Sequence, residues 1–173
     1  MRSPWGNPAT VHATGHRLLL REWGLPIEGV HVPNRHSDPG QSAADELAVR
    51  SLIIRLAQYA DGLGTVDQYA ELFTEDAEWL MPGSPRHGRE DIRNGSAQRR
   101  AEGGVGPGSN SRHMIAGTAM EFSSPDEAIA DSYWMYFVNT DTQAELKLVG
   151  HYRDTAVRTD AGWLLSRREI TFG

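Results

Sequence analysis

The chain has 173 residues, a formal net charge of −6 and no cysteine. Its length and its 39% hydrophobic content predict one globular domain with a buried core. The composition excludes disulfides, thiolate metal sites and cysteine nucleophiles, and the negative charge with dispersed arginines argues against a nucleic-acid partner.

Residues 1–41 differ in composition from the rest of the chain. They contain four of the seven histidines (His12, His16, His31 and His36) and no sustained period of 3.6 or 2. We therefore expect a mobile N-terminal extension over residues 1–41 and a folded domain over residues 42–173. The apolar run at residues 18–20 is too short for a signal-peptide core or a membrane span. This favours a cytoplasmic protein without a membrane partner.

Apolar residues at helical spacing from Val49 to Ala60 predict a long first helix. We expect Ser42 to cap its start, and the glycines at positions 62 and 64 to end it. A second, short helix is predicted by the capping box that Thr65 and Gln68 form.

Residues 77–81 predict a short strand, and residues 88–101 predict a third helix. The segment 103–109, Gly-Gly-Val-Gly-Pro-Gly-Ser, lacks the Lys-Ser/Thr pair that a phosphate-binding loop needs. It is better interpreted as a flexible loop or a pocket lid.

From residue 112 onward the hydrophobic period becomes 2, which predicts four strands in an antiparallel meander: 112–122, 127–139, 144–158 and 163–172. Helices followed by a long curved sheet are typical of an α+β fold. The strand 127–139 is apolar on both faces, so both must be covered. We expect helices and an enclosed pocket on one side and a partner subunit on the other.

Two residues stand out as candidates for acid–base chemistry. Asp61 falls on the shoulder of the apolar helical stripe, where it would point toward the interior and could act as an acid or base. The alternative is a carboxylate in water at the end of a helix. His113 heads a strand and could shuttle a proton near pH 7, or it could be a buried histidine bonded to a carbonyl. His151 is open to the same two interpretations.

Five short motifs occur in a characteristic order over residues 46–173. They are Leu-Ala-Gln-Tyr-Ala-Asp at 56–61, Leu-Phe-Thr-Glu-Asp-Ala-Glu-Trp at 72–79, Arg-His at 112–113, Gly-His-Tyr-Arg-Asp at 150–154, and Gly-Trp at 162–163 followed by Arg-Arg at 167–168. Together they resemble the SnoaL-like branch of the nuclear transport factor 2-like superfamily. That group includes scytalone dehydratase, bile-acid dehydratases, ketosteroid isomerase, polyketide cyclases and hexachlorocyclohexane dehydrochlorinase.

The resemblance implies a cone-shaped fold, in which a curved, mixed but mostly antiparallel sheet wraps around helices and encloses one pocket. It also implies an acid–base dyad of Asp61 and His113, without a cofactor or metal, in a chain that forms a homodimer or trimer. The expected reaction is proton abstraction and elimination on a small, largely apolar substrate of cyclic, steroid-like or polyketide-like structure.

The candidate substrate-binding residues are polar or bulky side chains expected near the pocket: Tyr59, Trp79, Met81, Tyr136, Asn139, Tyr152 and Asp154. At position 139 this chain has an asparagine, where the resemblance to scytalone dehydratase would place a second pocket histidine. The substrates of the two proteins should therefore differ. The same fold also serves as a non-catalytic ligand binder and as the small structural subunit of ring-hydroxylating dioxygenases. Either is the alternative to an enzyme.

Overall fold

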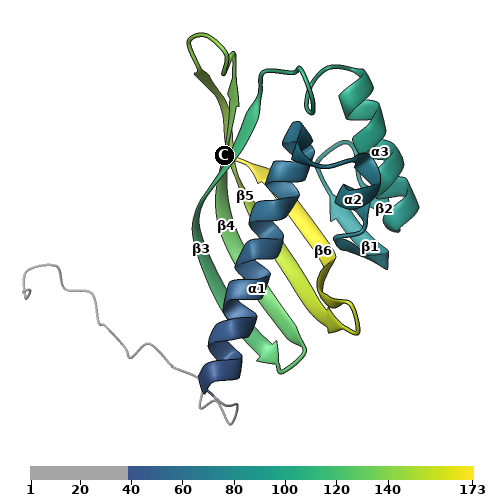
Figure 1. Ribbon diagram of the computed structural model, residues 1–173, viewed down its shortest axis with the longest axis vertical. Helices are drawn as coiled ribbons and strands as arrows, with labels where there is room; N and C mark the ends of the chain where they lie inside the picture. Colours follow the sequence, from purple (N-terminus) through teal and green to yellow (C-terminus); the bar gives the residue numbers. More distant parts are fainter. Residues whose placement is uncertain (1–38) are drawn as a thin grey trace, which may run out of the picture. The chain divides into compact units, whose positions relative to one another are not determined.

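The computed structural model describes residues 39–173, with side chains from residue 42 onward, so the predicted extension lies almost entirely outside the described residues. Figure 1 shows the described elements in chain order. The helical elements are α1 (Pro39–Gln58), a π-helical turn η1 (Tyr59–Leu63), α2 (Val66–Ala70) and α3 (Arg89–Ala101). The strands are β1 (Phe73–Leu80), β2 (Arg86–His87), β3 (Arg112–Ser124), β4 (Glu127–Val138), β5 (Glu145–Thr159) and β6 (Gly162–Phe172).

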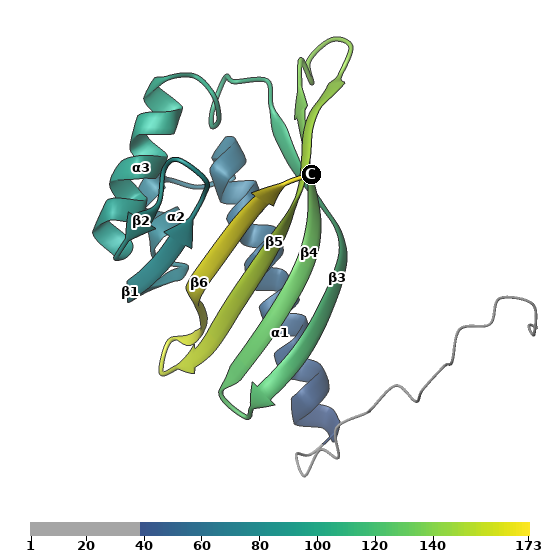
Figure 2. The same ribbon diagram turned by 180° about the vertical axis from the view of Figure 1, so that it is seen from behind.

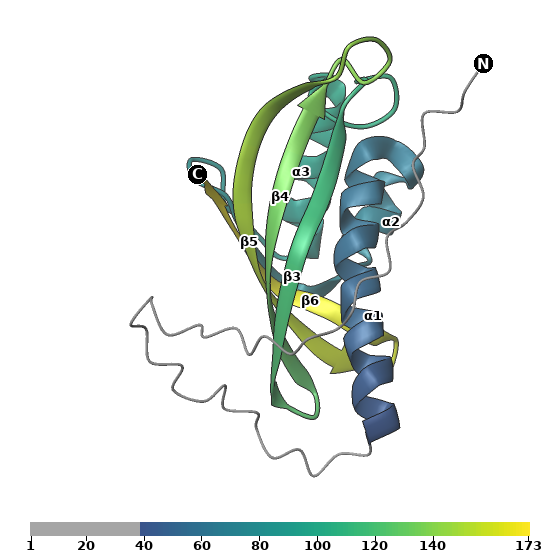
Figure 3. The ribbon, with the colours of Figure 1, turned by 90° about the vertical axis from the view of Figure 1, so that its left-hand side faces the viewer.

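The strands form one curved, unclosed sheet in the order β2-β1-β6-β5-β4-β3. Strands β3 to β6 are the antiparallel meander that the period of 2 predicts, and β1 joins β6 as the parallel pair. Helix α1 crosses one face of the meander, with α2 and α3 beside it near β1 and β2 (Figure 1). Figure 2 shows the opposite face, which no helix of the described chain covers, and Figure 3 shows the curvature of the strands. The α+β class and the mixed, mostly antiparallel sheet are confirmed.

The first helix begins earlier than predicted. Its first residue is Pro39, so Ser42 lies inside the helix and is not its N-cap. Proline suits the first turn because its missing N–H has no intrahelical acceptor there and its fixed φ matches the helix. The apolar stripe is as expected, since Val49, Ile53 and Leu56 are almost fully buried against the sheet.

The capping box at the start of α2 is confirmed. The backbone N–H of Gln68 donates to the Thr65 hydroxyl at 3.1 Å, and the backbone N–H of Thr65 donates to the Gln68 side chain at 2.9 Å. Strand β1, however, starts four residues before the predicted strand. The charged residues after Phe73 hide its β character in the sequence, whereas pairing of Phe73 with Leu165 in β6 supplies it.

Two bulges change which side chains face the helices. In β3 the register shifts at Gly117, whose φ of +60° suits glycine, and in β6 Ser166 is the extra residue. A residue inserted into one strand reverses the alternation beyond it. In β6, Leu165 and Arg168 therefore both face inward, although they are three positions apart and strict alternation would place them on opposite faces.

Candidate active site

A cavity of about 350 Å³ lies between the helices and the inner face of the sheet. Its wall is mostly apolar and aromatic, and the volume suits a small ligand. The lining residues come from helices, strands and the glycine-rich loop, and they include Trp79, Met81, Arg99, Glu102, Gly104, Val105, His113, Trp134, Tyr136, Tyr152 and Arg168.

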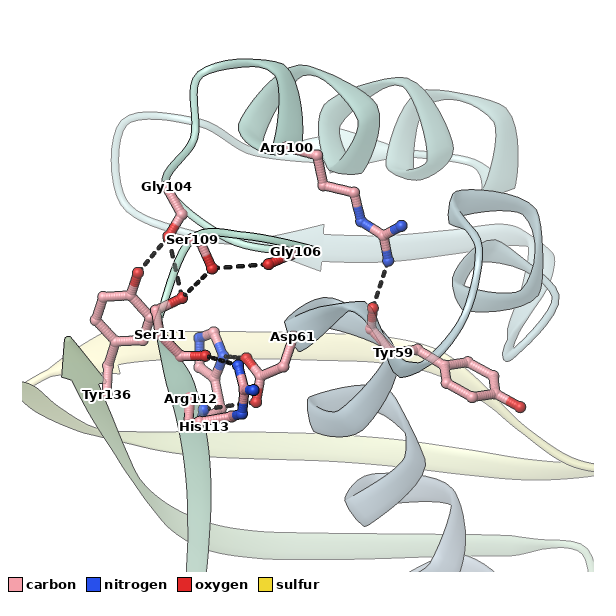
Figure 4. Close-up of polar contacts among 10 residues, drawn as sticks. All are labelled: Tyr59, Asp61, Arg100, Gly104, Gly106, Ser109, Ser111, Arg112, His113 and Tyr136. Atoms are coloured by element: carbon pink, nitrogen blue, oxygen red, sulfur yellow. Dashed lines mark hydrogen bonds and ion pairs between the residues drawn. The ribbon is translucent and has the colours of Figure 1, made fainter. Parts of the chain in front are cut away.

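Asp61 and His113 are in direct contact at this cavity (Figure 4). Asp61 Oδ1 lies 2.6 Å from His113 Nδ1, and Asp61 Oδ2 accepts the backbone N–H of His113 at 2.8 Å. The Asp61 side chain is 5% exposed and the His113 side chain 16%, and only the histidine lines the cavity. A carboxylate facing Nδ1 favours the tautomer that carries its proton there. Nε2 is then the nitrogen free to exchange a proton with a ligand.

The π-helical turn at the end of α1 sets the direction of Asp61. Arg100 of α3 holds this turn in place, because its Nη2 donates to the carbonyl oxygen of Tyr59 (Figure 4). The same nitrogen donates to the carbonyl oxygen of Gly64 at 2.9 Å. Gly62 within the turn has a φ of +99°, and a Cβ there would lie 2.7 Å from the backbone nitrogen of Pro107. Glycine therefore permits both the sharp end of the helix and the close approach of the glycine-rich loop.

The glycine-rich loop forms part of the cavity wall through Gly104 and Val105. The Gly104 carbonyl accepts a hydrogen bond from the Tyr136 hydroxyl and a longer one, 3.4 Å, from the Ser111 hydroxyl (Figure 4). The Tyr136 ring lies 4.8 Å from the His113 ring, centroid to centroid. Tyr136 thus connects the loop to the histidine, and its hydroxyl is engaged by the loop rather than free in the cavity.

Four of the predicted substrate-binding residues, Trp79, Met81, Tyr136 and Tyr152, line the cavity with His113. Tyr59 does not. Its ring packs on Gly64 and lies 6.0 Å from the Arg55 guanidinium, and Figure 4 shows it pointing away from Asp61. The π-helical turn places Asp61 on the inner side and directs the Tyr59 ring outward.

Asn139 and Asp154 are also placed outside the cavity lining. Asn139 directly follows β4 and has a φ of +55°, and its carbonyl accepts the Thr142 N–H at 3.1 Å in the turn before β5. A short polar side chain tolerates this left-handed conformation, so the residue belongs to the turn. Asp154 is fully buried and its carboxylate is used by Arg168 instead of facing a ligand.

Arg168 is a cavity residue that the sequence pattern did not identify. Its Nε and Nη2 donate to the two oxygens of Asp154, each at 2.7 Å, and its guanidinium lies 4.2 Å from the Tyr152 ring centroid. Burial acts against the charged form of Arg168, but the contacts with Asp154 outweigh it and raise the pKa above the ordinary value. The sequence did contain a signal for a buried cation such as Arg168. Asp154 was expected to face the pocket, and a buried carboxylate requires a cation nearby.

Tyr152 stacks on Trp134, with ring centroids 5.4 Å apart and planes 16° apart. Burial raises the pKa of the Tyr152 phenol, and the nearby Arg168 charge opposes this only in part. Tyr152 is therefore a neutral hydrogen-bond donor at physiological pH.

The raised pKa of Tyr152 predicts a loss of stability in alkali. The unfolded phenol releases its proton near its ordinary pKa of about 10, whereas the folded one retains it to higher pH. The unfolded state then binds fewer protons, so the free energy of unfolding should fall by up to about 1.4 kcal/mol per pH unit above pH 10. Urea unfolding at several pH values should show a steeper decline in the wild type than in Tyr152→Phe. Equal slopes would contradict the burial effect.

The remaining polar clusters of the described chain lie elsewhere. His151 Nε2 contacts Asp131 at 3.1 Å and does not line the cavity. Within the described residues, no group of three or more His, Asp or Glu side chains could hold a metal ion. No helix of this part of the chain is both long and apolar enough to span a membrane.

The fold occurs in solved proteins. An NTF2-like protein with a cystatin-like fold from Novosphingobium aromaticivorans is 26% identical, with a TM-score of 0.64 over 80% of this chain and 92% of that one. ActVI-ORFA from Streptomyces coelicolor is 25% identical, with a TM-score of 0.62 over 73% and 96%. A protein from N. aromaticivorans provisionally named scytalone dehydratase is 22% identical, with a TM-score of 0.64 over 78% and 87%, which shows the fold alone.

A comparison with curated proteins found no significant match. The profile of the SnoaL-like domain, by contrast, matches residues 41–169, which is most of the chain and includes most of the residues that line the cavity. The resemblance seen in the sequence motifs is thereby confirmed, and the chain belongs to the SnoaL-like domain family.

Proposed function

We propose that this protein is a lyase- or isomerase-type enzyme that needs no cofactor and acts on a small, largely apolar cyclic molecule. The observation that carries the proposal is the 2.6 Å contact between Asp61 and a His113 ring that lines an apolar cavity. Membership of the SnoaL-like family and a similar fold in a protein provisionally named scytalone dehydratase add support.

In the proposed reaction, His113 Nε2 removes a proton from a carbon next to an activating group of the substrate. The electron pair of that C–H bond forms a C=C bond, and a hydroxyl group on the neighbouring carbon leaves as water after taking the proton from the imidazolium. Asp61 stabilises the imidazolium and holds the ring in place, as the aspartate of a serine-protease triad does.

Negative charge that develops on the activating oxygen needs hydrogen-bond donors. Tyr152 is suited to be such a donor, because its phenol stays neutral, and so keeps its proton, at the cavity wall. Arg168 donates from Nε and Nη2 to Asp154, and its Nη1 makes no hydrogen bond within the described chain. The arginine can therefore hold Asp154 and still offer a donor to a substrate oxygen.

The proposal is tested with a panel of alicyclic and aromatic β-hydroxy ketones, incubated with protein dialysed against a chelator. Elimination would appear as absorbance of the conjugated enone, and isomerisation without elimination as deuterium uptake in D₂O followed by NMR. Saturable binding of panel members without turnover or exchange would favour the alternative, a non-catalytic ligand binder.

The homodimer is also a proposal, and the outer face of the sheet is its expected interface. Met114, Met135 and Val149 form a row across β3, β4 and β5, and Tyr133 on the next row is 67% exposed. Such an exposed apolar patch is typical of an interface. Sedimentation equilibrium should give a dimer for the wild type and a monomer for Tyr133→Asp. Leu47→Asp, at an equally exposed leucine of α1, should leave the dimer unchanged.

A further inference from the structure

The cavity wall holds one arginine that has no carboxylate partner among the described residues. Arg168 is paired with Asp154, whereas the Arg99 guanidinium makes no hydrogen bond or ion pair within the described residues. Arg99 lies on α3 with its guanidinium 4.5 Å from the ring centroid of Trp79, which is 5% exposed. The aromatic face supports the guanidinium from one side and leaves its N–H groups available.

The nearest acidic residue of the same wall is Glu102, three residues further along. Its Oε1 accepts a hydrogen bond from the Gln98 side chain at 2.9 Å, and it makes no ion pair with Arg99. Glu102 is exposed, so water screens its charge more strongly than that of the half-buried Arg99. The positive charge of Arg99 is therefore unmatched on the side that faces the cavity.

We propose that Arg99 binds an acid group on the ligand, so that the cavity takes an amphiphilic anion: an aromatic or alicyclic ring bearing a carboxylate or a comparable anionic group. The ring would pack among the aromatic side chains, and the acid group would form a charge-assisted hydrogen bond with Arg99. This inference rests on the proposed function only in assuming that the cavity is the substrate site. It extends the proposed function by naming the substrate class, which is a cyclic compound that carries an acid group.

Two fluorescent probes with the same rings test this charge preference. 8-Anilinonaphthalene-1-sulfonate carries a sulfonate, and N-phenyl-1-naphthylamine is its uncharged counterpart. Fluorescence titration of the wild type should give tighter binding of the sulfonate, and its affinity alone should fall as salt is raised. Arg99→Gln should weaken sulfonate binding about tenfold and change binding of the neutral probe less than twofold. Arg99→Lys should retain most of the sulfonate affinity.

Two further variants sharpen the measurement. Arg55→Gln is the matched control, because Arg55 also lies over an aromatic ring, that of Tyr59, but outside the cavity, and it should change neither affinity. Glu102→Gln should strengthen sulfonate binding, since it removes a nearby negative charge. Thermal unfolding of each variant checks that the fold is intact, and the salt dependence of the wild type provides the test without any substitution.

The proposal is overturned if Arg99→Gln weakens both probes equally, if Arg55→Gln has the same effect as Arg99→Gln, or if neither probe binds the wild type. Probe binding to Asp61→Asn separates this inference from the catalytic one. A dyad variant that loses turnover but binds the sulfonate like the wild type supports both. Charge-selective binding in a wild type without turnover would support the anion site and contradict only the enzyme.

Discussion

Asp61→Asn is expected to lower kcat by about 10²–10⁴-fold while leaving the fold intact, once a substrate is identified. The amide can still accept a hydrogen bond from residue 113, so the local geometry should persist. It carries no charge, however, and cannot stabilise the imidazolium that forms when His113 takes a proton. The measurement is the steady-state rate of enone formation or deuterium exchange, together with a urea unfolding curve for each variant.

His113→Gln should lose at least as much activity as Asp61→Asn, and the double variant little more than His113→Gln alone, because the two groups act as one unit. Asp76→Asn is the matched control: Asp76 is exposed, its carboxylate accepts from the Thr74 hydroxyl at 2.9 Å, and it lies outside the cavity. Undiminished turnover in Asp61→Asn would remove the dyad from the mechanism.

Removal of the Asp154 carboxylate is expected to cost far more stability than the loss of an exposed ion pair. Asp154 is fully buried and Arg168 is 3% exposed, and two hydrogen bonds join them. Asp154→Ala would leave a buried guanidinium without its counter-charge, which typically costs about 3–5 kcal/mol. Urea unfolding of the variant should show a lower midpoint with an unchanged slope.

Two further variants test the cause of that loss. Asp154→Leu combined with Arg168→Met removes both charges and should recover much of the stability, since a buried ion pair is often replaceable by apolar side chains. Asp131→Asn disturbs a more exposed pair with Arg153 and should cost less than about 1 kcal/mol. If Asp154→Ala were no worse than Asp131→Asn, Arg168 would be adequately solvated by the cavity and the interpretation would be wrong.

The sequence by itself determined the meander and the main helix, because both depend on local periodicity. Alternation of apolar residues defined β3 to β6 to within two residues, and the stripe from Val49 onward predicted the buried face of α1, although not its first residue. Asp61 and His113 were identifiable for the same reason, since one ends a helical stripe and the other heads a strand. The structure adds that the two side chains touch, and their catalytic role remains a prediction.

Only the tertiary structure decided which of the other polar residues face the cavity. The extra residue Ser166 turns Arg168 inward, whereas strict alternation from Leu165 would have placed Arg167 there. Arg168 in turn binds the Asp154 carboxylate, so that this carboxylate does not face the cavity. Arg99 lies at the cavity because α3 packs beside β1. Bulges, a π-helical turn and long-range ion pairs depend on contacts between segments far apart in the chain. A pattern read along the sequence follows one segment at a time, so it does not contain them.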